Sequence, residues 1–129
     1  MKRLIILTAS LLASASRLWA GDQCTSANSQ AVAYAFESLT VSTTALPFTV
    51  ATYTPASTGI RPIEATVTIA TANVRIRLDG AAPTSTVGHL YLAGQSFVVC
   101  APTIPLFRTI RDTGSAVDAV LTISYAVQQ

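Results

Sequence analysis

Short runs of alternating apolar and polar residues, separated by turn-forming residues, dominate the chain after residue 35. Residues 65–70 alternate threonine with valine and isoleucine, which is the two-residue period of a strand with one buried face. Residues 74–78 alternate apolar side chains with Arg75 and Arg77, and the short Ala72-Asn73 turn between the two runs predicts a β-hairpin. We therefore expect the clearest core strand and its hairpin partner between residues 65 and 80.

Further strands are expected at residues 89–92, 97–100, 107–110 and 120–127. The continuous apolar run at residues 97–100 is typical of a strand covered on both faces, and the last run places Leu121, Ile123 and Tyr125 on one face. Residues 40–54 are rich in threonine but are interrupted by proline, which predicts a sheet edge. The pattern as a whole predicts an all-β fold, an antiparallel and jelly-roll-like β-sandwich of about six to eight short strands.

The first part of the chain differs from the rest, so we divide the sequence into an N-terminal arm or signal-like segment, residues 1–35, and one sandwich domain, residues 36–129. Lys2 and Arg3 precede an apolar run and small residues follow as far as Ala20, which is the order found in secretory signal peptides. The apolar run of about ten residues is shorter than the ~20 that a spanning helix needs, so no stable membrane insertion is expected.

If the segment is retained, its leucines predict an amphipathic helix that docks on a neighbouring subunit. The candidate interface residues in this helix are Leu4, Leu7 and Leu11. The sequence leaves both alternatives open, an exported chain with a cleaved leader and an uncleaved docking arm.

Cys24 and Cys100 are the only two cysteines. Two thiols without histidine partners are too few for a structural zinc site, so no metal is expected. Cys100 ends an apolar run, which predicts a buried free thiol that packs like a small apolar side chain. A bridge to Cys24 is expected only if the chain is exported to an oxidising compartment.

The charge of the chain is small and unevenly placed. The formal net charge is +2, and three of the eight basic residues, Lys2, Arg3 and Arg17, lie in the first twenty residues, which leaves five against six acids in the body. Nucleic-acid binding requires clustered cations, so a nucleic-acid partner is not expected. A weakly charged, threonine-rich surface instead favours assembly with protein partners.

Four arginines are candidate interface residues, because arginine forms planar, bidentate ion pairs at interfaces. They are Arg75, Arg77, Arg108 and Arg111. One interpretation is that they pair with acids on a neighbouring subunit, and the other is that they form the solvated face of an antiparallel sheet.

Catalytic chemistry is not indicated. His89 is the one histidine and lies near Ser85 and Asp79 in sequence, but closeness in sequence does not make a triad, and no serine has a nucleophile-elbow pattern. The glycines form no phosphate-binding loop, since no lysine follows them. We expect no enzyme activity and no cofactor.

One part of the sequence resembles a group of small virion proteins of tailed bacteriophages. The resemblance lies in Arg-Ile-Arg-Leu-Asp-Gly at residues 75–80, Ala-Pro-Thr-Ser-Thr-Val-Gly-His-Leu at residues 82–90 and Ala-Gly-Gln-Ser at residues 93–96. A strand at residues 107–111 followed by a polar turn and a final strand at residues 118–125 is also similar to that group. The resemblance spans roughly residues 38–125, and the signal-like leader departs from it.

The resemblance implies a capsid decoration or cement subunit, located at the virion surface, that binds the major capsid protein and copies of itself. The alternative from the leader and the cysteines is an exported, periplasmic or secreted, β-sandwich binding or adhesion module. Both are binding functions without chemistry.

Overall fold

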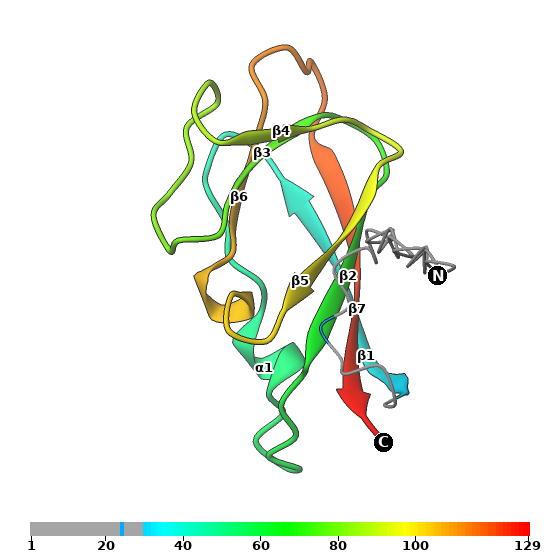
Figure 1. Ribbon diagram of the computed structural model, residues 1–129. Coiled ribbons are helices and arrows are strands. Elements are labelled where there is room, and N and C mark those ends of the chain that lie inside the picture. Colours follow the sequence, from blue (N-terminus) through cyan, green and yellow to red (C-terminus); the bar gives the residue numbers. More distant parts are fainter. Residues whose placement is uncertain (1–23, 25–29) are drawn as a thin grey trace, which may run out of the picture.

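The larger of two antiparallel sheets is built around the C-terminal strand. The computed structural model describes Cys24 and residues 30–129. Within this part of the chain the strand order of the larger sheet is β1 (Ala31–Val41), β7 (Ala119–Gln128), β2 (Glu64–Ile69) and β5 (Ser96–Cys100). β7 therefore lies between the first and second strands of the chain, and β1 and β5 form the two edges (Figure 1).

The smaller sheet has β3 in its centre. Its order is β4 (His89–Tyr91), β3 (Val74–Arg77) and β6 (Arg108–Arg111). The segment that follows β1 continues along the free side of β6, where Leu46 and Thr109 exchange backbone hydrogen bonds of 2.8 and 2.9 Å. Two short helices lie in connections: α1 (Val50–Tyr53) between β1 and β2 of the larger sheet, and η1 (Ile104–Leu106) between β5 of the larger and β6 of the smaller sheet.

The two sheets pack face to face, and this confirms the all-β sandwich. The alternation expected in the last strand is also confirmed, because Leu121, Ile123 and Tyr125 are all fully buried. Aromatic side chains fill one part of the core: the rings of Phe48 and Phe107 are stacked with centroids 3.8 Å apart, and Tyr125 meets Phe48 edge-on. Alternation works here because each strand has one face toward the other sheet.

The hairpin expected between residues 65–70 and 74–78 is wrong. β2 pairs with β7 and β5, whereas β3 pairs with β4 and β6 in the other sheet. The chain does not turn back after β2, because Ala70 stays hydrogen-bonded to β7, with its N–H 2.8 Å from the Val120 carbonyl oxygen. The short segment between β2 and β3 is thus a crossing from one sheet to the other.

Two edges differ from the sequence-based expectation. The run at residues 97–100 was expected to be covered on both faces, but β5 is an edge strand in which Val99 is buried and Val98 is 38% exposed. At the other edge, β1 begins at Ala31, inside the segment assigned to the arm, so the sheet includes residues placed outside the domain. The candidate residues Leu4, Leu7 and Leu11 lie outside the described residues.

Candidate functional site

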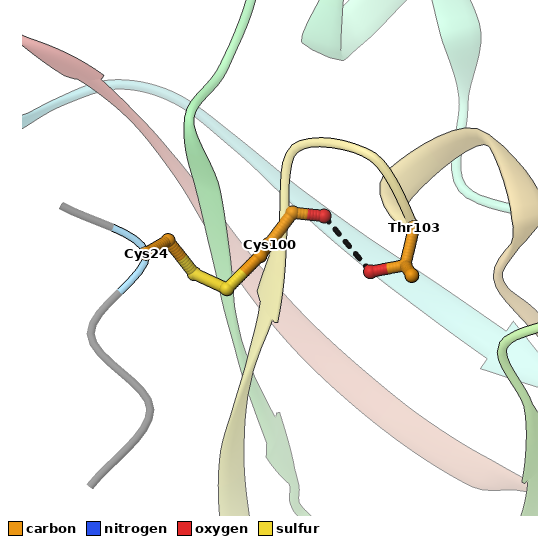
Figure 2. Close-up of a disulfide and its surroundings, with 3 residues drawn as sticks. All are labelled: Cys24, Cys100 and Thr103. Atoms are coloured by element: carbon orange, nitrogen blue, oxygen red, sulfur yellow. Dashed lines mark hydrogen bonds between the residues drawn. A yellow bond between two sulfur atoms is a disulfide. The ribbon is translucent and has the colours of Figure 1, made fainter.

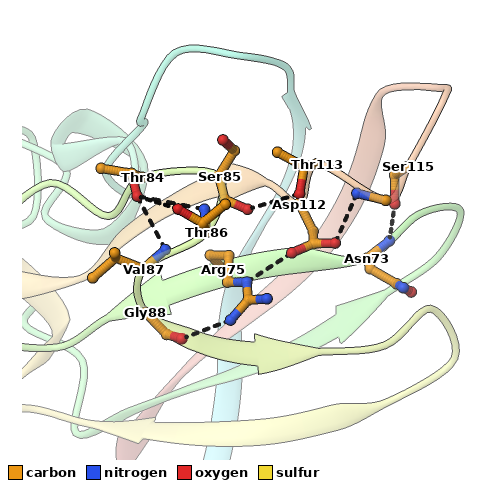
Figure 3. Close-up of polar contacts among 11 residues, drawn as sticks. Asn73, Arg75, Thr84, Ser85, Thr86, Val87, Gly88, Asp112, Thr113 and Ser115 are labelled. Carbon is orange, nitrogen blue, oxygen red and sulfur yellow. Dashed lines mark hydrogen bonds and ion pairs between the residues drawn. The ribbon is translucent and has the colours of Figure 1, made fainter.

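Arg75 forms the centre of a polar cluster on the outer face of the smaller sheet. Its Nε donates to Asp112 Oδ1 at 2.7 Å and its Nη1 to the Gly88 carbonyl oxygen at 3.3 Å (Figure 3). The N–H of Gly114 donates to the other Asp112 oxygen at 2.9 Å. The bond from Arg75, followed by that from Gly114, holds the pKa of Asp112 below its usual value.

Arg77 also pairs with an acid of its own chain. Its Nε donates to Asp79 Oδ1 at 3.0 Å and its Nη2 donates to Oδ2, so the contact is bidentate. The Ala81 N–H donates to the same carboxylate at 3.2 Å. The bond from Arg77 is the largest cause that lowers the pKa of Asp79 to about 2.

The remaining two arginines of the predicted set are engaged locally as well. Arg111 Nη1 donates to Asp118 Oδ1 at 2.8 Å, and Arg108 Nη1 donates to the carbonyl oxygens of Pro105 and Phe107 at 3.1 and 2.7 Å. Three of the four arginines thus have an acid partner within the chain. This weakens the interpretation in which these arginines pair with acids on a neighbouring subunit, because three of them already pair with acids of their own chain.

The loop between β3 and β4 is clamped near the Arg75 cluster. Thr84 Oγ1 accepts a hydrogen bond from the Val87 N–H at 3.0 Å, and the Thr113 N–H donates to the Ser85 carbonyl oxygen at 3.2 Å (Figure 3). Pro83 of this loop is buried. The loop is therefore held in place by the sheet and by the turn that follows β6.

An open cleft of about 530 Å³ lies at the end of this loop. It is lined by Arg77, Leu78, Asp79, Val87, Gly88 and His89. His89 is exposed, and the carboxylate of Asp79 accepts bonds from Arg77 and Ala81. The carboxylate that was considered for a triad, Asp79, is therefore bonded to residues other than His89.

The two cysteines form a disulfide bridge (Figure 2). Cys100 ends the edge strand β5, and its carbonyl oxygen accepts a hydrogen bond from Thr103 Oγ1 at 2.9 Å. The expected buried free thiol at Cys100 is wrong. The bridge, which the sequence analysis kept as the alternative for an exported chain, links the segment before β1 to the strand at the opposite edge of the larger sheet.

A buried carboxylate was missed by sequence reasoning. Glu37 on β1 is only 8% exposed, and its Oε1 accepts hydrogen bonds from the Tyr125 hydroxyl and, at 3.2 Å, from the Thr49 N–H. Burial and the bond to Glu37 raise the pKa of Tyr125. The alternation of β1 places residue 37 on the core face, which is the signal that would have found it.

A second cleft of about 530 Å³ lies near this buried pair, between α1 and the η1 connection. Its lining is mainly apolar, with Arg61 as its one charged residue. The residues are Val50, Tyr53, Thr54, Arg61, Pro62, Ala101, Pro102, Ile104 and Pro105.

The outer face of the larger sheet carries a regular set of hydroxyl groups. Alternation directs these side chains outward, because their neighbours along β2 and β7 are fully buried. We call this surface the hydroxyl face, and its members are Ser38, Thr40, Thr66, Thr68, Ser96, Thr122 and Ser124. One row crosses all four strands from Phe36 through Ser124 and Thr66 to Val98.

Within Cys24 and residues 30–129, no three side chains of the metal-ligating types gather at one place. In the same part of the chain, no helix has the length and apolar character needed to cross a membrane. Comparisons with protein-family models, with curated proteins and with solved structures found no match.

Proposed function

We propose that the protein is an exported β-sandwich module that acts by binding a partner and not by catalysis. The observation that carries this proposal is the Cys24–Cys100 bridge. Disulfides form and persist in oxidising surroundings such as the bacterial periplasm and the extracellular space. The signal-like pattern that precedes Cys24 agrees with such a route.

The polar side chains of the smaller sheet support binding through a rigid scaffold. Asp112 and Asp118 are paired with Arg75 and Arg111 toward one end of the smaller sheet, and Asp79 is paired with Arg77 at the opposite end. Binding residues are commonly placed on loops and faces held by such a scaffold. The hydroxyl face and the two clefts are the surfaces on which a partner would be accommodated.

A second candidate function is a capsid decoration or cement subunit at the virion surface, with the major capsid protein as its partner. The resemblance described above supports it, and the resembling segments coincide with β3, the clamped loop, β4, β6 and β7. Virion surfaces are also oxidising, so the bridge is compatible with this candidate. Many copies on a symmetric shell would multiply weak contacts into strong attachment.

The test is the intact mass of the protein isolated from its source under non-reducing conditions. For the exported module we expect a chain shortened by about twenty residues at its N-terminus, two hydrogens lighter than the reduced form and recovered outside the cytoplasm. Full-length protein that copurifies with capsids would favour the second candidate. Full-length protein with two free thiols in the cytoplasm would contradict the exported module.

A further inference from the structure

β1 presents a long strand edge with no partner strand in the described part of the chain. It has eleven residues, and its ladder is formed with β7 on one side only. A β-bulge interrupts the register between Ala33 and Ala35, after which the pairing runs regularly as far as Val41. The second half of β1 is therefore a regular edge strand.

The alternation of the antiparallel ladder identifies the backbone groups at this edge. The Ala70 N–H donates to the Val120 carbonyl oxygen. The backbone N–H and C=O groups of even-numbered residues of β7 therefore point toward β2, and those of odd-numbered residues point toward β1. The β1 residues that oppose Leu121, Ile123 and Tyr125 are Leu39, Glu37 and Ala35. The residues between them then direct their N–H and C=O groups away from the sheet, and these are Phe36, Ser38 and Thr40.

The side chains of these three residues would not hinder the addition of another strand at this edge. Phe36 is 62% exposed, and Ser38 and Thr40 are small, uncharged and exposed. Glu37, the one charged residue of β1, is buried in its bond with Tyr125. Natural edge strands are usually protected by lysine, proline, bulges or short length, and after the bulge β1 has none of these.

The other edges are better protected. β5 has five residues, and the carbonyl oxygen of Cys100 at its end is already bonded to Thr103. β4 has three residues. β1 is thus the edge at which another strand adds with the least obstruction.

We propose that β1 of one copy pairs antiparallel with β1 of a second copy, so that the larger sheet continues across a two-fold axis. An identical strand suits this edge, because the residues that would meet bear no charges that repel each other. The two-fold arrangement brings the exposed Phe36 rings of both copies to one side of the joined sheet and closes the assembly at two chains.

The pairing gains main-chain hydrogen bonds together with the burial of two aromatic rings. The contact is confined to the regular half of β1, so it falls below the ~1,200 Å² typical of stable complexes, and we expect weak, concentration-dependent dimers. This inference goes beyond the proposed function and holds for the exported module and the virion subunit alike.

Sedimentation velocity on the bridged protein as isolated, from about 10 µM to about 1 mM, tests the association. The weight-average mass is expected to rise from one chain toward two. Amide exchange followed by NMR locates the contact: the N–H groups of Phe36, Ser38 and Thr40 should exchange at least about tenfold more slowly at the highest concentration. A single-chain mass throughout, or association without slowing at these amides, would overturn the proposal.

Two variants and a matched control distinguish pairing at this edge from nonspecific association. Phe36→Lys replaces an aromatic ring of the contact with a charged side chain, and Ser38→Pro removes a free N–H, so both should remain monomeric over the whole range. Val98→Lys is the control, since Val98 lies at the other end of the same cross-strand row on the opposite edge, and it should dimerise like the parent protein. Equal loss of association in Val98→Lys would contradict the assignment to β1.

Discussion

Arg75 and Asp112 illustrate how burial changes the value of an ion pair. Their side chains are 24% and 10% exposed, and the carboxylate has a second donor in the Gly114 N–H. Arg111 and Asp118 form a pair of the same kind, but the Asp118 side chain is 47% exposed. Water competes for the second pair much more than for the first, so only the first is expected to contribute much to stability.

The variant Asp112→Ala should lower the free energy of unfolding by about 1–3 kcal/mol, because Arg75 and Gly114 lose a charged acceptor. Asp118→Ala, the matched control, should lower it by less than about 1 kcal/mol. Urea denaturation near neutral pH measures both. Equal losses in the two variants would show that burial does not set the strength of these pairs.

The lowered pKa values of Asp112 and Asp79 predict a loss of stability in acid. A carboxylate whose pKa is lower in the folded than in the unfolded state stabilises the fold above the unfolded value, here 3.8. This stabilisation decreases as the pH falls from 3.8 toward about 2, the folded pKa of Asp79. Thermal unfolding across this range should show a steeper decline for the parent protein than for Asp112→Ala, and parallel curves would contradict the linkage.

The hydrogen bond between the buried Glu37 and Tyr125 predicts that substitutions of its two partners destabilise the protein by different amounts. Tyr125→Phe keeps the ring in the core but removes a donor from a buried carboxylate, so the free energy of unfolding should fall by about 1–3 kcal/mol. Glu37→Gln retains an acceptor for the Tyr125 hydroxyl and the Thr49 N–H, and should cost less. Denaturant titrations of both variants check this order, and a neutral Tyr125→Phe would refute it.

At the scale of elements, the connection between β3 and β4 depends on a glycine. The connection from β3 to β4 returns to the smaller sheet at Gly88, whose φ is +131°. A Cβ at this position would lie 3.0 Å from the Ile76 carbonyl oxygen and 3.3 Å from its nitrogen. Glycine is required here both by the backbone conformation and by the approach of the neighbouring strand.

Gly88→Ala should therefore destabilise the protein by at least about 1–3 kcal/mol, the typical cost of a strained backbone conformation. Gly94→Ala is the matched control: its φ is +87°, but a Cβ there meets no atom within 4 Å. The difference between the two midpoints of unfolding reports the contact with β3. A larger loss in Gly94→Ala would contradict the close approach seen at Gly88.

At the scale of the whole molecule, the Cys24–Cys100 bridge connects residues 76 positions apart. It ties the chain ahead of one edge strand, β1, to the other edge strand, β5. A cross-link of this span restricts the unfolded chain strongly, by about 4.5 kcal/mol in the chain-entropy description.

Reduction of the bridge, or the double variant Cys24→Ser with Cys100→Ser, should lower the free energy of unfolding by about 2–5 kcal/mol. Chemical denaturation with and without reductant measures the difference. Reductant added to the double variant is the control and should have no effect. An unchanged midpoint after complete reduction of the parent protein would show that the bridge does not support the fold.

The sequence by itself determined the fold class and the orientation of most side chains. Alternation in residues 65–69, 74–77 and 121–125 predicted which side chains point to the core, and the two arginines of β3 lie on the outer face as expected. Leu78, which was expected on the core face, lies beyond the end of β3 and is 36% exposed. These predictions succeeded because the direction of a side chain in a strand depends on its immediate neighbours along the chain.

The tertiary structure alone decided which strands and side chains meet. The failed hairpin after β2, the edge position of β5, the burial of Glu37 and the bridge of Cys24 with Cys100 all depend on segments distant in sequence. Arg75 and Asp112 are likewise 37 residues apart. Local periodicity specifies a face but contains no information about the partner strand, because the partner is chosen where the chain crosses between the sheets.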